Sequence, residues 1–350
     1  GEFPEFSIEE RTMDTGEPVI VPIECTLPPI PGIAPGQTIT VGSIDFTINQ
    51  GSFIEIAVDD QVTGYINTLD SVIFDNGAKI ACTVNMQQMP DVGTDPTMNL
   101  CIEFPERYIF DDNRITDNKL VLNSQKISKG VPFEISPALN VRGIRFDNET
   151  ISESLIIKDS VGVNVEIKYP EAKIGYETAN NLSIYGDVTV SVSNAILKEI
   201  YGLIEYSTDT PQYSEVELTD IPDELRNPQN VFDVRPIIDF EYTSNICVPV
   251  KADMDITPYI NNEVLKNNVV DFTLELPAAN RQKDSTTTVV HLGRTTWEYA
   301  DINVQKDLSP IVRTIPDKFK VGYAMSAIQE GQHYIDCSKK AIASINCNVK

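Results

Sequence analysis

The chain has 350 residues, 41% hydrophobic and 23% charged, which is enough to bury sizeable cores in two or three domains. Its 52 acidic and 27 basic side chains give a net charge of −25 and a pI near 4.4. This balance argues against a surface for nucleic acid or anionic lipid, since both need a basic face. It predicts a solvated, self-repelling surface, with cation binding or a basic partner as the alternative.

No apolar run reaches the roughly 18 residues of a membrane-spanning helix, and no signal peptide is visible. The start, Gly1-Glu2-Phe3, is a mature end or a cloning remnant and is left out of the fold prediction. We therefore expect no transmembrane segment.

The six cysteines are too sparse for a disulfide scaffold, and the absence of a CxxC pair excludes thioredoxin-type chemistry and zinc ribbons. Cys82 shares strand parity with Val84 and Met86 and is predicted to be buried. Cys101 has the opposite parity from its apolar neighbours and is the better candidate for a disulfide.

Hydrophobic residues alternate with polar ones in many short runs, which predicts strands with one buried and one solvated face. These runs span residues 44–48, 54–58, 82–86, 163–167, 188–192, 272–276 and 345–349. Turns are expected at Asp75-Asn76-Gly77, Asp111-Asp112-Asn113 and Asn261-Asn262. Helix is rare: residues 194–206 fit a short helix or a strand, and residues 221–225 fit one helical turn. The pattern predicts an all-β chain of tandem antiparallel, immunoglobulin-like β-sandwiches with few short helices.

Val21-Pro22, Val131-Pro132 and Val248-Pro249 are each followed by an apolar and then a charged residue, at spacings close to one sandwich domain. They suggest three repeats, although strands of sandwiches often carry proline at an edge without repetition. The predicted divisions are an N-terminal arm with a Pro-rich linker over residues 1–35, then sandwiches over residues 36–130, 131–247 and 248–350.

The catalytic motifs that we sought are missing or incomplete. Asp14-Thr15-Gly16 occurs once, whereas an aspartic protease needs two such loops, so it is interpreted as a polar turn. His291 and His333 are the chain's two histidines, and there is no G-x-S-x-G elbow, H-E-x-x-H or phosphate-binding glycine loop. His291 has the opposite parity from Val290 and Leu292, which predicts a strand-surface histidine.

Calcium is the most plausible ion, because it binds oxygen ligands from loops. Its weak candidate ligands are Asp111, Asp112, Asp253 and Asp255, with Asp59-Asp60 as a further acidic pair. None matches the EF-hand pattern, so the expectation is no cofactor, with calcium as the exception and solvated turns as the alternative.

Glycan contact is the second weak candidate. The single tryptophan, Trp297, shares a strand face with Tyr299, and flat aromatic surfaces suit sugar rings. A pair among the many acids could also serve a glycosidase, although acids at a suitable separation arise easily by accident. Core packing is the alternative for these aromatic residues.

The acidic alternation, the strand ends Phe104-Pro105, Tyr169-Pro170 and Leu276-Pro277, and the turns Ile221-Pro222-Asp223 and Ile315-Pro316-Asp317 resemble secreted surface lipoproteins of Bacteroidetes. Those proteins carry rows of β-sandwich domains, and the resemblance covers most of the chain after residue 35. It implies an extracytoplasmic protein, on a bacterial outer-membrane surface or in the periplasm, that functions in envelope binding or adhesion. It also implies a lipid anchor ahead of residue 1, and it assigns no functional residue.

The first hypothesis for function is therefore a non-enzymatic binding or adhesion protein whose partner is a protein or glycan at the cell surface. A carbohydrate-active hydrolase or glycan-binding protein using an Asp/Glu pair is the alternative, and a carrier of an apolar ligand such as a lipid is the third.

Overall fold

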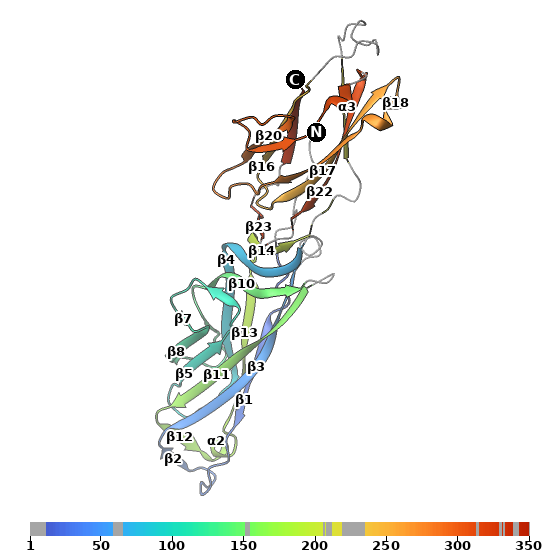
Figure 1. The fold of residues 1–350 in the computed structure, drawn as a ribbon. Coiled ribbons are helices and arrows are strands. Elements are labelled where there is room, and N and C mark those ends of the chain that lie inside the picture. The colour runs from blue at the N-terminus through green and yellow to red at the C-terminus, as the bar shows by residue number, and fades with distance from the viewer. Residues whose placement is uncertain are drawn as a thin grey trace. The chain divides into compact units, whose positions relative to one another are not determined.

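The computed structural model describes residues 12–58, 66–150, 155–205, 207, 212–218, 235–312, 315–328, 331, 333–338 and 343–349. This part of the chain is built almost wholly from strands (Figure 1). Its helices are α2 (Tyr176–Asn180), α3 (Ser309–Val312) and the 3-10 turn η1 (Lys266–Asn268). The predicted all-β class with few short helices is confirmed. None of the described helices is long and apolar enough to cross a membrane.

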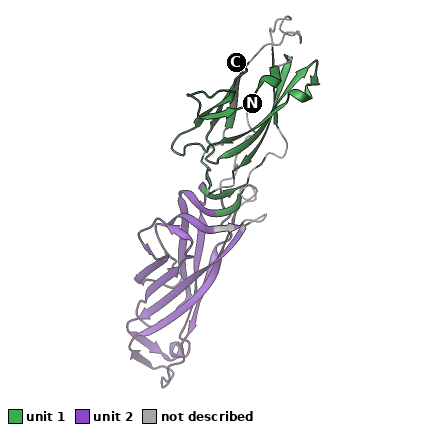
Figure 2. Ribbon diagram, viewed as in Figure 1, with its two compact units in different colours: residues 1–9, 65–69, 200–350 green, residues 10–64, 70–199 purple. Residues whose placement is uncertain are grey.

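The chain divides into two compact units (Figure 2). The first, here the N-terminal unit, comprises residues 10–64 and 70–199. The second, here the C-terminal unit, comprises residues 1–9, 65–69 and 200–350.

One sheet of the N-terminal unit has the order β1-β13-β4-β10-β6, with β9 and β14 also paired to β4. Its strands are β1 (Val19–Thr26), β4 (Ile66–Gln88), β6 (Tyr108–Phe110), β9 (Phe133–Glu134), β10 (Leu139–Thr150), β13 (Ser183–Ser193) and β14 (Leu197–Ile204). The second sheet has the order β3-β11-β5-β8-β7. It contains β3 (Ile44–Val58), β5 (Thr97–Glu103), β7 (Ile115–Thr116), β8 (Lys119–Lys126) and β11 (Leu155–Tyr169). A separate antiparallel pair joins β2 (Thr38–Val41) to β12 (Ala172–Gly175).

The hydrophobic alternation of these strands builds the core of the N-terminal unit. β3 and β11 pair along their whole length without a register shift, so every second side chain of both strands turns to the same face. Phe46 and Tyr169 are fully buried there and contact each other edge to face, with ring centroids 6.2 Å apart. Cys82 is buried on β4 as predicted, whereas Cys101 on β5 is a half-buried free thiol.

The C-terminal unit is a second sandwich with a five-stranded and a four-stranded sheet. The five-stranded sheet contains β15 (Gln212–Glu217), β17 (Val250–Ile260), β18 (Glu263–Val264), β19 (Val270–Leu276) and β22 (Lys318–Ala327). The four-stranded sheet contains β16 (Ile238–Ser244), β20 (Thr286–Gly293), β21 (Ile302–Gln305) and β24 (Ala343–Val349). Residues 200–204 of β14 also belong to the C-terminal unit, and β23 (His333–Asp336) pairs with β14. One buried cluster joins both sheets, including Phe240 and Leu292 of the one and Met254, Phe272 and Phe319 of the other.

This division differs from the predicted arrangement of an arm and three sandwiches. Residues 19–26 are not part of an arm, since they form β1 and pair with β13. β11 pairs with both β3 and β5, so segments on either side of the expected boundary at residue 131 share one sheet. Long-range strand pairing therefore sets the units, and the Val-Pro spacing does not.

The predicted strands all lie within strands, and residues 194–206 contain β14 rather than a helix. Asn261-Asn262 forms the expected turn with both φ angles positive, at 51° and 65°. Asp75-Asn76-Gly77 is not a turn between strands. It lies inside β4, where Asn76 and Gly77 adopt φ of 55° and 71° and Asp75 N–H donates to Ile196 C=O. The helical turn predicted at residues 221–225 lies outside the described residues.

Candidate ligand-binding groove

An open groove of about 410 Å³ lies along the five-stranded sheet of the C-terminal unit. It is lined by residues 253–255 of β17, residues 271–273 of β19 and residues 323–324 of β22. The middle residues Met254 and Phe272, and also Tyr323, belong to the core. Because side chains alternate along a strand, the neighbours of these core residues point to the opposite, outer face of the sheet, where the groove lies. We call this site the aspartate groove, defined by Asp253, Asp255, Asp271, Thr273 and Ala324.

The strand register arranges the groove in rows across the sheet. Asp255 is paired with Asp271 on one side and with Gly322 on the other, and Gly322 is in turn paired with Tyr213 of β15. One row therefore reads Tyr213, Gly322, Asp255, Asp271. The next row places Ala324, Asp253 and Thr273 side by side.

Gly322 lets two of these side chains lie close against the backbone. A Cβ atom at this position would lie 2.1 Å from Asp255 Oδ1 and 2.9 Å from Tyr213 Cε1. The Tyr213 ring and the Asp255 carboxylate thus converge above the glycine. Tyr213 remains 54% exposed, and Lys320 Nζ lies 4.5 Å from its ring centroid.

The three carboxylates of the groove have different environments. Asp253 accepts hydrogen bonds from Thr273 Oγ1 at 2.7 Å and from Lys251 Nζ at 3.2 Å, which hold the pKa of its carboxyl below the ordinary value. Asp255 accepts one from Thr257 Oγ1 at 2.9 Å. Asp271 has neither a hydrogen bond nor an ion pair within the described part of the chain. Two carboxylates directly opposite each other, Asp255 and Asp271, destabilise the sheet slightly.

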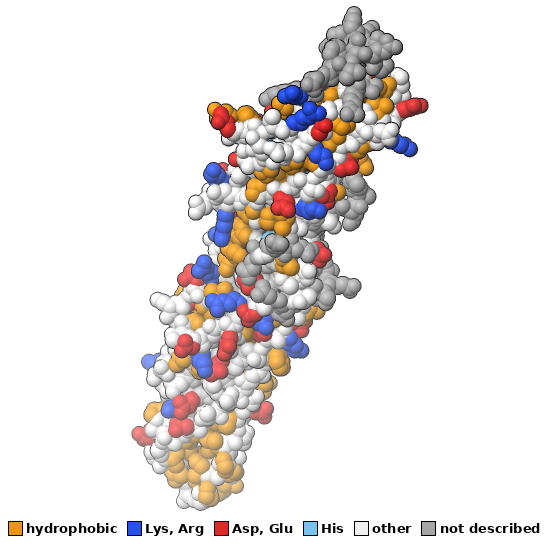
Figure 3. Space-filling model, in the orientation of Figure 1, with side chains coloured by type: hydrophobic (Ala, Val, Ile, Leu, Met, Phe, Trp, Pro, Cys, Tyr) orange, Lys and Arg blue, Asp and Glu red, His pale blue; other side chains and the backbone are white. Residues whose placement is uncertain are grey.

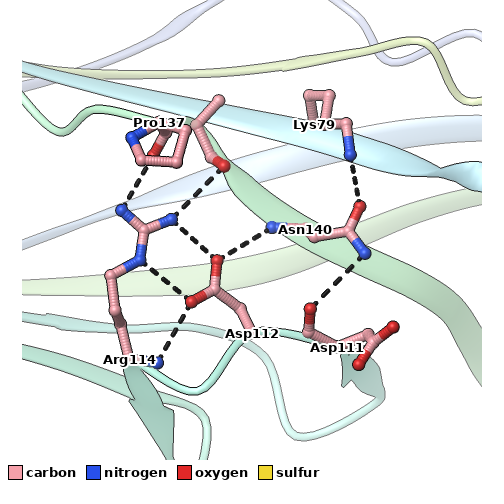
Figure 4. Close-up of polar contacts among 7 residues, drawn as sticks. Lys79, Asp111, Asp112, Arg114, Pro137 and Asn140 are labelled. Carbon is pink, nitrogen blue, oxygen red and sulfur yellow. Dashed lines mark hydrogen bonds and ion pairs between the residues drawn. The ribbon is translucent and has the colours of Figure 1, made fainter.

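Asp111 and Asp112 lie in the N-terminal unit and do not line the aspartate groove. The Arg114 guanidinium donates two hydrogen bonds to the Asp112 carboxylate, from Nε to Oδ1 at 2.9 Å and from Nη2 to Oδ2 at 2.7 Å (Figure 4). The same guanidinium donates to the carbonyl oxygen of Pro137, and Asn140 N–H donates to Asp112 Oδ2. These bonds, led by those from Arg114, lower the pKa of Asp112 to about 2. The carboxylate that was a candidate calcium ligand is therefore a structural clamp for its loop.

Asp253 and Asp255 are brought together with Asp271, which lies on another strand. Within the described ranges, no group of three or more His, Cys, Asp or Glu side chains is arranged to hold a metal ion. The remaining acidic pair, Asp59-Asp60, lies outside those ranges. Asp14-Thr15-Gly16 forms the polar turn that was expected, with Gly16 N–H donating to Asp14 Oδ1.

Trp297 and Tyr299 lie in the loop between β20 and β21 rather than on a strand. They contact each other edge to face with centroids 5.9 Å apart, and Trp297 also packs on the ring of His291. Tyr299 is 72% exposed, so the predicted pair is not part of the core.

The expectation of a strand-surface His291 is wrong. His291 has the predicted parity, but it is only 4% exposed, and its Nδ1 lies 2.8 Å from Asp239 Oδ1. Its Nε2 is buried without a partner among the described residues, and no nucleophilic side chain bonds to it there. His333 is also buried, which lowers its pKa, and its Nδ1 accepts the N–H of Ile204.

Tyr213, Asp271, Thr273 and Gly322 were missed by the sequence reasoning. The alternation Asp271-Phe272-Thr273 was a usable signal, because it places both polar side chains on one outer face. Nothing local to the sequence shows which strands lie beside β17.

Comparisons with known proteins find no matching family model and no matching curated protein. Three solved structures align over much of the chain. One is a protein of Parabacteroides distasonis named as a candidate secreted protein, with 8% identity, coverage of 99% of this chain and 95% of the other, and a TM-score of 0.21. Another is from the infectious bursal disease virus Gx strain, with 10% identity, coverage of 99% and 74%, and a TM-score of 0.18.

The third is the CBM22-1-CBM22-2 tandem domain of Paenibacillus barcinonensis Xyn10C, with 7% identity, coverage of 87% and 94%, and a TM-score of 0.16. Superpositions of this quality show only a weak likeness, which includes one to a candidate secreted protein of the Bacteroidetes. They carry no argument about function.

Proposed function

We propose that the protein is a non-enzymatic, extracytoplasmic binding protein of the bacterial cell surface, and that the aspartate groove binds a glycan. The observation that carries the proposal is an open groove lined by three carboxylates, with the exposed Tyr213 ring beside Asp255 at its edge. Envelope binding and adhesion, with a glycan or a glycosylated protein as partner, follow from such a site.

The chemistry of the groove suits a polyhydroxylated ligand. Carboxylates accept strong hydrogen bonds from hydroxyl groups, and an aromatic ring packs against the C–H face of a sugar. Asp271 is unpartnered in the described part of the chain, so its oxygens are available to ligand hydroxyls. A neutral sugar needs no countercharge, which suits a surface that carries both acidic and basic side chains across the face seen in Figure 3.

Hydrolysis of the glycan would need a carboxylic acid that stays protonated near neutral pH. In the groove, hydrogen bonds from Thr273 and Lys251 shift the pKa of Asp253 the opposite way. Asp253 is therefore poorly suited to act as the general acid of a hydrolase.

An apolar-ligand carrier is the least supported function. The apolar pocket lined by Val216, Ile256, Val312 and Phe319 holds about 20 Å³, roughly the space of one water molecule. An acyl chain does not fit there.

The experiment is a glycan array probed with the intact protein, followed by product analysis of each bound glycan. Tyr213→Ala and Asp271→Asn remove a ring and a free carboxylate from the groove. Tyr185→Ala and Glu263→Gln are the matched controls, because Tyr185 is similarly exposed at 43% and Glu263 is an exposed acid of β18. We expect the first two variants to give a weaker array signal, the controls to keep the full signal, and no glycan to be cleaved. Cleavage, or equal signal from all four variants, would reject the proposal.

A further inference from the structure

The outer face of the four-stranded sheet carries a second feature, on the opposite side of the same sandwich from the aspartate groove. Val290 and Leu292 of β20 turn into the shared core, so His291 between them turns outward. Residues 294–301, here the Trp297 loop, connect β20 to β21 and place Trp297 on the ring of this histidine.

The Trp297 loop is anchored at both ends. The Asn303 side chain accepts the N–H of Trp297 at 2.7 Å and donates to its C=O at 3.2 Å. Arg294 donates to Asp307 at 2.9 Å and to Ser309 at 3.1 Å. Asp301 accepts Val289 N–H at 2.8 Å. A loop tied to β20, β21 and the segment after β21 presents its side chains with little conformational freedom.

A buried hydrogen bond between Asp239 and His291 lies beneath the loop. Asp239 and His291 are directly paired across β16 and β20, and both are buried although they lie on the outer face. Trp297 covers His291 with ring centroids 5.9 Å apart, and Tyr299 packs edge-on against Trp297. The stack from Asp239 to Tyr299 therefore holds an exposed aromatic ring on a rigid base.

Tyr299 leaves 72% of its surface to solvent, which exceeds every other exposed large hydrophobic side chain in the described ranges. Glu298 lies beside it, is exposed, and has neither a hydrogen bond nor an ion pair within the described part of the chain. An exposed ring next to a free carboxylate offers a sugar both a C–H stacking surface and a hydroxyl acceptor.

We propose that the Trp297 loop is a second carbohydrate-binding site, in which Tyr299 stacks on a sugar ring, Glu298 accepts its hydroxyl hydrogens, and Asp239 and His291 position Trp297. The proposal shares its ligand class with the proposed function but uses different residues on the opposite face. Two sites on one sandwich let the protein bind two glycan chains, or two stretches of one polymer, and so raise avidity.

The test uses the chain's single tryptophan as its reporter. Cellohexaose, xylohexaose and chitohexaose are titrated to millimolar concentration into the intact protein while the emission of Trp297 is followed. We expect at least one to change the emission saturably, Tyr299→Ala to weaken that binding about tenfold, and Tyr299→Phe to keep it because the ring remains. Tyr185→Ala is the control for loss of an exposed tyrosine.

The failure of this proposal is separable from failure of the aspartate groove. Tyr213→Ala should leave the emission titration unchanged, because it acts on the other face. If Tyr213→Ala abolishes the emission change, the signal originates at the groove and the second site is rejected. It is equally rejected if none of the three hexasaccharides changes the emission, or if Tyr299→Ala binds as tightly as the intact protein. None of these results affects array binding that depends on Tyr213.

Discussion

Asp239 and His291 face each other across β16 and β20, with Asp239 Oδ1 2.8 Å from His291 Nδ1, on the outer face of a sheet where solvent is expected. The Trp297 loop excludes that solvent, since Asp239 is 7% and His291 4% exposed. The buried Asp239–His291 hydrogen bond is therefore expected to stabilise the C-terminal unit and to support the proposed second site.

Removing one partner of this pair should destabilise the C-terminal unit. Asp239→Ala leaves the buried His291 Nδ1 without its hydrogen-bond partner, which costs about 1–3 kcal/mol. Urea unfolding followed by Trp297 emission reports this unit alone, because the chain holds a single tryptophan. Glu241→Ala, on the same strand and face but exposed, should change stability by at most about 0.5 kcal/mol. Equal effects of the two variants would show that the pair contributes nothing.

The Asp112–Arg114 clamp predicts how the N-terminal unit responds to acid. The pKa of Asp112 is lowered from 3.8 to about 2 in the folded chain. As the pH falls, the carboxylate therefore becomes protonated at a lower pH in the folded state than in the unfolded state. Its contribution is therefore complete above about pH 4 and is lost as the pH falls through about 2. Asp112→Asn should cost about 1–3 kcal/mol at neutral pH and reduce the loss of stability over that window.

Urea unfolding monitored by far-UV circular dichroism at pH 7, 4 and 2 measures both effects of Asp112→Asn. Asp111→Asn is the matched control, because Asp111 bonds to Asn140 through its main-chain N–H and C=O and not through its carboxylate. An acid response of Asp112→Asn identical to that of the intact protein would contradict the role of the clamp.

Gly322→Ala should block the aspartate groove without unfolding the sheet. The added methyl would overlap the Asp255 carboxylate and press on Tyr213, so both must move. We expect affinity for the array-selected glycan to fall about tenfold and stability to fall by about 1–3 kcal/mol, as for an overpacked site. Gly42→Ala, where nothing lies within 4 Å, should change neither quantity. Calorimetric titration of both variants measures the affinity, and unchanged binding by Gly322→Ala would place the ligand elsewhere.

Cys82 should resist alkylation in the folded protein. Burial raises the pKa of its thiol to about 12, so the reactive thiolate is scarce at pH 8. Iodoacetamide labelling and peptide mass spectrometry should find Cys82 unmodified until urea is added, while half-buried Cys25 reacts earlier. Rapid native labelling of Cys82 would show that β4 opens far more readily than a core strand.

The fold class could be predicted from the sequence, because strict alternation of apolar and polar residues, as in residues 163–167, is typical of a strand with one buried face. The units could not be predicted, because β11 pairs with β3 although residues 59–154 separate the two strands in sequence, and no local signal encodes that pairing. The prediction at Asp75-Asn76-Gly77 was wrong for a related reason. Residues with positive φ are typical of a hairpin turn, but here β4 continues through them.

The candidate sites show the same limit. Asp253 and Asp255 were identified as an acidic pair, and Trp297 and Tyr299 as an aromatic pair, because each pair is close in sequence. Asp271, Tyr213 and Gly322 reach the groove only through sheet register. His291 was placed on the correct face, but its burial depends on a loop whose position its strand does not reveal.

The most direct test of the central claim is calorimetric titration of the array-selected glycan into the intact protein, Tyr213→Ala, Asp271→Asn and Tyr185→Ala. The account predicts that the intact protein and Tyr185→Ala bind alike, that each groove variant binds about tenfold more weakly, and that the glycan is recovered uncleaved. Equal affinity across all four proteins, or recovery of cleaved glycan, would contradict it.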